Sequence, residues 1–204
     1  MKKVSIAVLV SGGGTNLQAL IDAQNSGKLK SGSICTVISS KPGVYALERA
    51  KLAGIPSYVA DKQTFGNDTE AFGKAISEHL DAHGAEVIVL AGFLSKLPDD
   101  ICAKYKDKIL NIHPALIPSF CGKGFYGLHV HEAALKYGVK VSGATVHLVD
   151  NEYDHGRILM QKAVDVLDGD TPETLQKRIM EQAEHIILPE AVEKLCSELL
   201  EKER

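Results

Sequence analysis

Two polar residues stand at the end of a short apolar run, in a position where their side chains could do chemistry. Asn111 and His113 lie within the segment Ile109-Leu110-Asn111-Ile112-His113-Pro114. On a β-strand, residues two apart point to the same face, and Pro114 would end the strand because it has no N–H to donate. Open α/β sheets bind ligands at the carboxyl ends of their strands, so this amide and imidazole predict a ligand site. A pair hydrogen-bonded only within the core is an alternative that this segment alone does not exclude.

A second candidate site lies near the start of the chain. The loop Ser11-Gly12-Gly13-Gly14-Thr15-Asn16 follows the apolar run 4–10 and precedes a helical pattern that begins at Thr15. Several backbone N–H groups and the positive end of the helix dipole would then point to one spot, which is typical of an anion site. The loop fits neither the dinucleotide-binding nor the ATP-binding glycine motif. A single phosphate is therefore favoured over NAD or ATP, with a glycine turn that binds nothing as the alternative.

Several acidic residues follow a later apolar run. Asp150, Glu152 and Asp154 come shortly after His147 in the segment 143–156. A carboxylate close to His113 would favour the charged form of its imidazole. A solvated turn is the commoner role for such a loop, and the spacing alone does not choose among the three acids.

Buried strands alternate with amphipathic helices along most of the chain. This order predicts an α/β fold with a doubly wound, mostly parallel sheet, a C-terminal antiparallel extension and a final helix, all within one domain, 1–204. The loop 114–128 is long enough to be functional. In the last helix, Pro189 is expected to begin a second segment. The predicted strands are 4–10, 33–39, 57–59, 87–91, 109–113, 139–149 and 158–166, and the predicted helices begin at Thr15 or cover 45–53, 69–83, 99–105, 131–137 and 172–201.

Composition narrows the class of protein. The net charge of −3 gives no reason to expect nucleic acid or a membrane as a partner, and no run is long enough to cross a bilayer. The cysteines are widely spaced without a Cys-x-x-Cys pair, which favours a reducing, cytoplasmic location. No metal site is expected, because His79-x-x-x-His83 lacks the glutamate of a zinc motif and His129-x-His131 is interpreted as capping or substrate contact.

Taken together, these segments closely resemble the folate-dependent phosphoribosylglycinamide formyltransferases of purine synthesis. The resemblance covers nearly the whole chain in the same order and implies their Rossmann-like formyltransferase fold. The segments that carry it are VLVSGGGTNLQAL at 8–20, VLAGF at 89–93, NIHPALIPSF at 111–120, TVHLVDNEYDHG at 145–156 and AEH at 183–185.

The resemblance implies a role for each matching residue. Asn111, His113 and Asp154 would be the catalytic group, with Asp154 chosen because the family's acid stands two residues before the glycine that Gly156 matches. His147 would support them. The substrate phosphate and ribose would be held by Gly13, Gly14, Thr15, Asn16 and Glu184. The folate would be bound, largely through backbone groups, by Phe93, Leu94, Ser95, Lys96, Leu97, Val149 and Asp150.

The resemblance also implies a reaction and its substrates. A formyl group would pass from the co-substrate 10-formyltetrahydrofolate to the amine of glycinamide ribonucleotide, without a metal, in a monomer or homodimer. Asn111 and a protonated His113 would stabilise the oxyanion, while Asp154 would raise the pKa of His113 and help to move a proton. Three positions depart from the family pattern. Ser95-Lys96-Leu97 and Asn67-Asp68-Thr69 lack an arginine that many members carry, and Glu181 replaces a neutral or basic residue.

Other classes of function use some of the same features. A 10-formyltetrahydrofolate hydrolase would use the Asn, His and Asp but would not need the glycine loop. A non-catalytic nucleotide-binding module would need the loop but not the catalytic group. Formyl transfer to methionyl-tRNA would need a basic surface or an RNA-binding domain, and this acidic chain shows neither.

Overall fold

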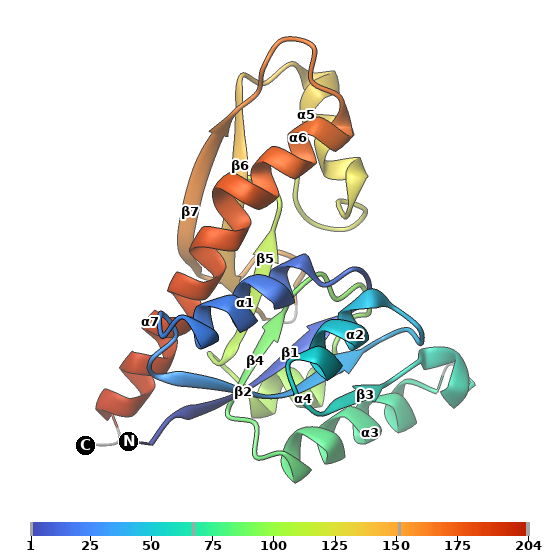
Figure 1. Cartoon of the computed structure of the whole chain (residues 1–204). Helices are drawn as coiled ribbons and strands as arrows, with labels where there is room; N and C mark the ends of the chain where they lie inside the picture. Colours follow the sequence, from blue (N-terminus) through green and yellow to red (C-terminus); the bar gives the residue numbers. More distant parts are fainter. Residues whose placement is uncertain (1, 67, 151, 203–204) are drawn as a thin grey trace.

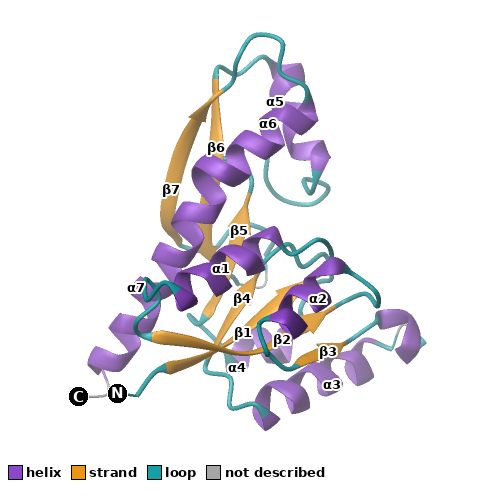
Figure 2. Cartoon of the chain, in the orientation of Figure 1, coloured by secondary structure: helices purple, strands orange, loops and turns teal. Residues whose placement is uncertain are grey.

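The chain folds around one seven-stranded sheet, which the computed structural model describes over residues 2–66, 68–150 and 152–202 (Figures 1 and 2). The strand order is β3-β2-β1-β4-β5-β6-β7. Neighbouring strands from β3 to β5 are parallel, whereas β6 is antiparallel to both β5 and β7. The predicted α/β fold with its antiparallel extension is confirmed. The strands are β1 (Val4–Val10), β2 (Gly32–Ser39), β3 (Ser57–Val59), β4 (Val87–Leu90), β5 (Ile109–His113), β6 (Val141–Leu148) and β7 (Ile158–Asp165).

Helices cover both faces of the parallel part of the sheet. Side chains alternate along β1, so Ile6 and Val8 join an apolar cluster with α1, α2 and α7, while Ala7 and Leu9 join another with α3 and α4. This two-sided burial explains why the central strands read as continuous apolar runs. The helices are α1 (Thr15–Asn25), α2 (Tyr45–Leu52), α3 (Thr69–Ala82), α4 (Asp99–Lys104), α5 (Leu128–Tyr137), α6 (Pro172–Ile179) and α7 (His185–Lys202), with a 3-10 turn at Lys62–Phe65 and a π-helical segment at Met180–Glu184.

The antiparallel strands β6 and β7 extend away from the rest of the sheet, with α5 and α6 along one side (Figure 1). In the pairing of β5 with β6, Asn111 lies opposite His147 and His113 lies opposite Thr145. Both predicted catalytic residues of β5 therefore share a face with residues of β6. The end of β5 also lies next to the end of β4 and near that of β1, at the point where the order of the strands reverses.

Two predicted helix boundaries are wrong. The C-terminal helix is not interrupted at Pro189, which lies inside α7. The interruption comes earlier, at Met180–Glu184, where a widened π-helical turn joins α6 to α7. Proline removes one helical N–H, and that loss near the start of α7 does not end the helix. The helix expected from His131 begins one turn earlier, at Leu128.

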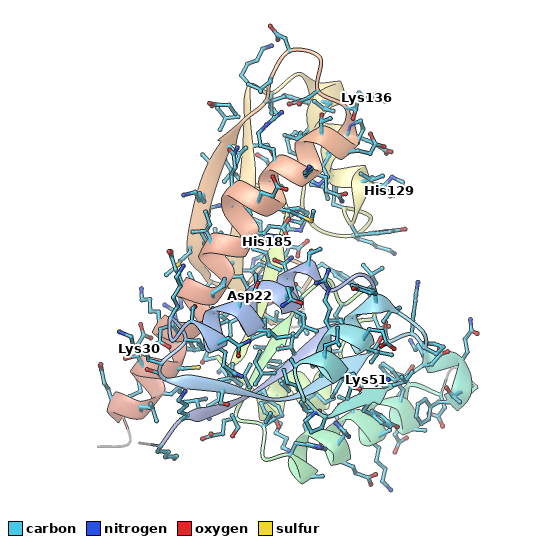
Figure 3. The ribbon with its side chains drawn as sticks, in the orientation of Figure 1. Asp22, Lys30, Lys51, His129, Lys136 and His185 are labelled. Atoms are coloured by element: carbon cyan, nitrogen blue, oxygen red, sulfur yellow. The ribbon has the colours of Figure 1, made fainter. Side chains whose placement is uncertain are left out.

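Polar side chains cover the outside of the molecule (Figure 3). The labelled lysines Lys30, Lys51 and Lys136 are exposed and lie on well separated elements, so they form no common basic patch. Among the described residues, no helix is long and apolar enough to cross a membrane.

Candidate active site

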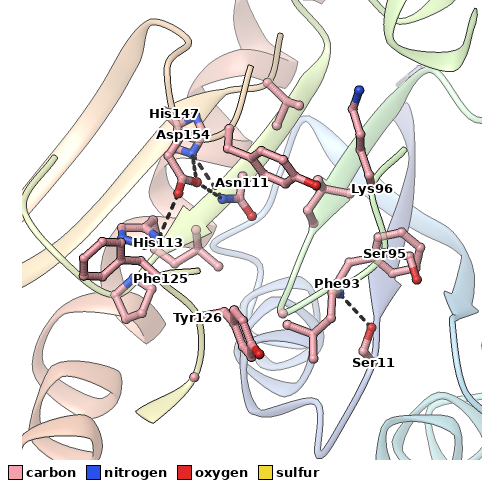
Figure 4. A pocket seen from close by; sticks show the side chains of 18 of the residues that line it. Ser11, Phe93, Ser95, Lys96, Asn111, His113, Phe125, Tyr126, His147 and Asp154 are labelled. Carbon is pink, nitrogen blue, oxygen red and sulfur yellow. Dashed lines mark hydrogen bonds and ion pairs between the residues drawn. The ribbon is translucent and has the colours of Figure 1, made fainter. Parts of the chain in front are cut away.

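The side chains of β5 and β6 form a short hydrogen-bonded chain at the carboxyl end of β5 (Figure 4). Nδ1 of His147 lies 2.8 Å from the Leu148 carbonyl oxygen, and because a carbonyl can only accept, this nitrogen carries the proton. Nε2 of His147 is then free to accept a hydrogen bond from Nδ2 of Asn111 at 3.1 Å. His147 thus fixes the orientation of the Asn111 amide. Its supporting role in catalysis stays a prediction.

Asp154 is the acid of its loop that contacts this chain of residues. Its Oδ2 accepts a hydrogen bond from the Gly122 N–H at 2.8 Å and lies 3.7 Å from Nδ1 of His113. Its Oδ1 lies 3.5 Å from both Nδ2 of Asn111 and Nε2 of His147. These contacts identify Asp154, among the three acids of the loop, as the one that lies next to Asn111 and His113. The spacing of the acids in the sequence could not make that choice.

The other acids of the loop have different partners. Asp150 accepts a hydrogen bond from the Glu152 N–H at 2.9 Å and lies 3.3 Å from the exposed His155. Asp150 still lines the cavity described below, on the side predicted to bind folate.

Opposing effects set the pKa of Asp154. Burial acts to raise it, but the nearby imidazoles of His147 and His113 and the Gly122 N–H together hold it below its ordinary value. Asp154 is therefore ionised at neutral pH. Its backbone is left-handed, with φ of 55°, a conformation that aspartate tolerates better than most residues.

The expected effect of Asp154 on His113 is outweighed by burial. His113 is almost fully buried, and this burial lowers its pKa more than Asp154 and the Phe120 carbonyl raise it. Nε2 of His113 donates to that carbonyl at 2.8 Å, so the unprotonated Nδ1 of the neutral ring faces Asp154. Asp154 acts in the predicted direction, but burial has the larger effect, so His113 is neutral in the free protein at neutral pH.

A cavity of about 850 Å³ opens beside these residues. It brings Asn111, His113, His147 and Asp154 together with Asn16 and Glu184 from the other end of the chain. All residues predicted to bind folate also line it, namely Phe93, Leu94, Ser95, Lys96, Leu97, Val149 and Asp150. The structure thus gathers the predicted catalytic and folate residues, and part of the predicted phosphate and ribose group, around one space.

The π-helical segment and the glycine loop meet in this cavity. Glu184, the last residue of the π-helical segment, is buried and accepts a hydrogen bond from Nδ2 of Asn16 at 2.6 Å. Burial raises the pKa of Glu184, and the bond from Asn16 opposes that shift. Widened π-turns occur often at functional sites. Here the turn carries a buried carboxyl group at the edge of the predicted phosphate site.

The residues of the glycine loop occupy different positions. Ser11, Gly12 and Asn16 line the cavity, whereas Gly13, Gly14 and Thr15 are not among the described residues that line it. Gly14 precedes the first turn of α1 with φ of 73°. The first turn of a helix has unpaired N–H groups, so an anion could still reach this end of α1. The phosphate role of Gly13, Gly14 and Thr15 stays a prediction.

The described residues at the positions that depart from the family pattern make contacts outside the catalytic group. Glu181 is exposed, and its carboxylate lies 3.9 Å from Nζ of Lys177. Lys96 lines the cavity and forms an ion pair with Asp99 at 3.3 Å. Asp68 caps the start of α3, and Asn67 lies outside the described residues.

Sequence analysis missed several residues of the cavity wall. The segment 122–127 lines it with Phe125 and Tyr126, and its only signal was the length of the loop between β5 and α5. Lys41 also lines the cavity, and its position just after β2 could have indicated this. The interpretation of His131 as a capping or substrate residue is wrong, because His131 is fully buried within α5 and is not among the lining residues. Within the described part of the chain, no group of three or more His, Cys, Asp or Glu residues could hold a metal.

Comparison with known proteins agrees with this geometry. The family model described as formyl transferase matches residues 4–192. The chain belongs to the formyl transferase family. The matched range includes every residue that lines the cavity, from Ser11 to Glu184, so the family match extends over the whole site.

Named relatives of this formyl transferase come from several organisms. It is 44% identical over 195 residues to the trifunctional purine biosynthetic protein adenosine-3 of Gallus gallus, covering 96% of this chain but only 19% of that protein. It is 38% identical over 197 residues to the chloroplastic phosphoribosylglycinamide formyltransferase of Arabidopsis thaliana, covering 97% and 67% of the two chains. The crystal structure of glycinamide ribonucleotide transformylase 1 from Symbiobacterium toebii aligns with a TM-score of 0.88 and 40% identity, covering 96% of this chain and 88% of that one.

Proposed function

We propose that this chain transfers the formyl group of 10-formyltetrahydrofolate to the amine of glycinamide ribonucleotide in purine biosynthesis. The observation that carries the proposal is the shared cavity, in which the Asn111, His113 and Asp154 group faces the same space as Asn16 and Glu184. A formyl donor and a phosphate-bearing amine could therefore meet at the catalytic group. The relatives named for this reaction support the same substrates.

The two substrates would occupy opposite ends of the cavity. Gly13, Gly14, Thr15 and Asn16 would bind the phosphate at the start of α1, where helical N–H groups favour an anion. Glu184 would accept hydrogen bonds from the ribose hydroxyls. The folate would lie along Phe93, Leu94, Ser95, Lys96, Leu97, Val149 and Asp150, all of which line the cavity.

The amine nitrogen would attack the formyl carbon directly, and the electron pair of the C=O bond would move onto oxygen. The Asn111 amide has two N–H groups, one held by His147 and the other only in a long 3.5 Å contact with Asp154. The developing oxyanion would replace that weak contact. A well-placed donor to an oxyanion is worth about 3 kcal/mol of transition-state stabilisation.

Proton transfer would complete the reaction. The negative oxygen would favour a charged imidazole, so Nδ1 of His113, unprotonated in the free protein, would take up a proton from water as the intermediate forms and return it when the intermediate collapses. Asp154 would help to carry the proton from the attacking nitrogen to the folate nitrogen, directly or through water. The bond between the formyl carbon and that nitrogen then breaks, which releases formylated ribonucleotide and tetrahydrofolate. The proposed mechanism uses no metal.

The absorbance change on deformylation of a formyl-folate analogue tests this proposal. It is measured with and without glycinamide ribonucleotide. A signal that requires the ribonucleotide supports the transferase. An equal signal without it would identify a hydrolase, and ribonucleotide binding with no signal would identify a non-catalytic nucleotide-binding module.

The proposal also covers the setting of the enzyme. We propose that residues 1–204 act as one formyltransferase domain in the cytoplasm, as a monomer or homodimer, without a nucleic-acid or membrane partner. The free thiols Cys35, Cys102, Cys121 and Cys196 support a reducing compartment. Sedimentation velocity of the purified chain distinguishes the two oligomeric states.

A further inference from the structure

The hydroxyl group of Ser11 connects three strand ends. Ser11 follows β1 directly and is buried, with 6% of its surface exposed. Its Oγ accepts a hydrogen bond from the Leu94 N–H, which follows β4, at 2.9 Å (Figure 4). The same Oγ lies 2.5 Å from Oγ of Ser40, which follows β2, and the two hydroxyls share a hydrogen bond. The ends of β1, β2 and β4 are thus held together through one side chain.

The loop that contains Leu94 has few backbone hydrogen bonds among the described residues. This loop, Gly92–Leu97, has no helical or strand structure, and the Leu94 side chain is mostly exposed. Among the described residues, the bond from Leu94 to Ser11 is the one hydrogen bond made by a backbone group of this loop. Lys96 contributes only a side-chain pair with Asp99 at the surface. Phe93 and Leu97 pack against the apolar cluster that includes α3 and α4, so the Ser11 bond fixes the loop backbone between these two packed side chains.

The Ser11 hydroxyl can make few further hydrogen bonds. A hydroxyl has one proton to donate and two lone pairs, and here it already has the Leu94 N–H and the Ser40 hydroxyl as partners. Although Ser11 opens the glycine motif, its hydroxyl faces the β4 loop and β2. Ser11, the first residue of the motif, thus contacts the β4 loop and β2, whereas the glycines that follow it are predicted to bind the phosphate.

We propose that Ser11 is a positioning residue for the formyl donor. Its hydroxyl holds the loop Gly92–Leu97 at the cavity wall, so that the backbone of this loop is ordered before the folate binds. Preorganising a binding loop raises affinity because less conformational entropy is lost on binding. This inference rests on the proposed function, since it assigns the loop to the folate end of the cavity.

The Ser11→Ala variant tests the inference by steady-state kinetics. It leaves the Leu94 N–H without its acceptor, so the KM for the formyl-folate is expected to rise about tenfold. The KM for the ribonucleotide is expected to change less than about twofold, because the glycine backbone is untouched. Ser40→Ala is the matched control, which removes the other partner of the same hydroxyl but keeps the Leu94 bond. It should raise the KM for formyl-folate less than about threefold.

Several outcomes would overturn the inference. A rise in the KM for the ribonucleotide alone would place Ser11 in the phosphate site, and equal effects of the two variants would assign it a general structural role. Calorimetric titration with tetrahydrofolate separates the two proposals. If Ser11→Ala binds tetrahydrofolate as tightly as the unmutated protein, the inference about Ser11 is rejected but the proposed function is not. If the unmutated protein binds no tetrahydrofolate, the proposed function is rejected as well.

A measurement on the wild-type protein covers the case in which the variant does not fold. Amide hydrogen exchange followed by NMR should show the Leu94 N–H protected at least about tenfold more than those of Phe93, Ser95 and Lys96. Exchange of Leu94 as fast as that of its neighbours would overturn the inference.

Discussion

Nδ1 of His113 lies 3.7 Å from Oδ2 of Asp154, yet the imidazole has a lowered pKa. Burial disfavours the charged ring more strongly than the carboxylate favours it. The Phe120 carbonyl holds the proton on Nε2, so a basic nitrogen faces an ionised carboxylate in the free protein. The pair can therefore take up a proton when negative charge develops beside it, which is the behaviour that direct formyl transfer requires.

Replacing the carboxylate tests this relationship. In Asp154→Asn the pKa of His113 is expected to fall further, because the charge that raises it is lost. The imidazole titration is followed by NMR. Turnover should fall about a hundredfold, with a much smaller change in the KM for the ribonucleotide. Glu152→Gln, in the same loop, is the control for the titration and should leave the pKa of His113 unchanged. An unchanged or raised pKa in Asp154→Asn, or equal losses in kcat and ribonucleotide affinity, would contradict the assignment.

The sequence predicts the β5 part of the site because strand geometry alone brings Asn111 and His113 to one face. It does not predict the partner of His113, since three acids lie within five residues of one another and only the folded loop separates them. The resemblance supplied Asp154 where periodicity could not. The lowered pKa of His113 depends on burial by several elements. The sequence around His113 does not predict that burial.

The C-terminal part was predicted less well for a similar reason. A π-turn has no strong residue signature, so the buried position of Glu184 was not visible in the helical pattern, whereas Pro189 gave a misleading break. The cavity wall at 122–127 depends on how a long loop folds back over β5, which spacing does not determine.

His131 should make the protein less stable in acid. It is fully buried, neither ring nitrogen has a hydrogen-bond partner among the described residues, and burial together with the nearby His113 lowers its pKa from 6.5 to about 4. Between these values the unfolded chain binds the proton and the folded chain does not, so stability falls as the pH drops from 6.5 to 4. This group alone contributes about 3 kcal/mol of that loss.

The matched variants for this prediction lie on the same helix. Urea unfolding between pH 7 and pH 4.5 should show a weaker pH dependence in His131→Leu than in the wild type. His129→Gln should retain the wild-type dependence, because His129 is exposed and pairs with Glu132 at 3.0 Å. A His131→Leu variant with the full wild-type dependence would show that other groups cause the loss.

Glu184 is expected to act on ribonucleotide binding. Its carboxyl group is buried and takes the Asn16 N–H at 2.6 Å, and an amide in its place would lose acceptor capacity toward Asn16 and the ribose hydroxyls. In Glu184→Gln the KM for the ribonucleotide should rise about tenfold, with the KM for formyl-folate changed less than about twofold. Glu181→Gln is the control, since the Glu181 side chain is exposed on the previous turn. Equal effects of the two variants on ribonucleotide KM would reject this role for Glu184.

Two neighbouring glycines of the loop should differ in what they tolerate. Gly14 has φ of 73°, and a Cβ there would lie 2.7 Å from Cβ of Ala46 in α2, so both backbone and packing oppose a side chain. Gly13 has no atom within 4 Å of an added Cβ. In urea unfolding, Gly14→Ala should cost about 2 kcal/mol and Gly13→Ala less than about 0.5 kcal/mol. Similar losses would show that the whole loop is packed. The expected difference would mean that Gly14 is required for the contact between α1 and α2, while the space beside Gly13 is open to a ligand.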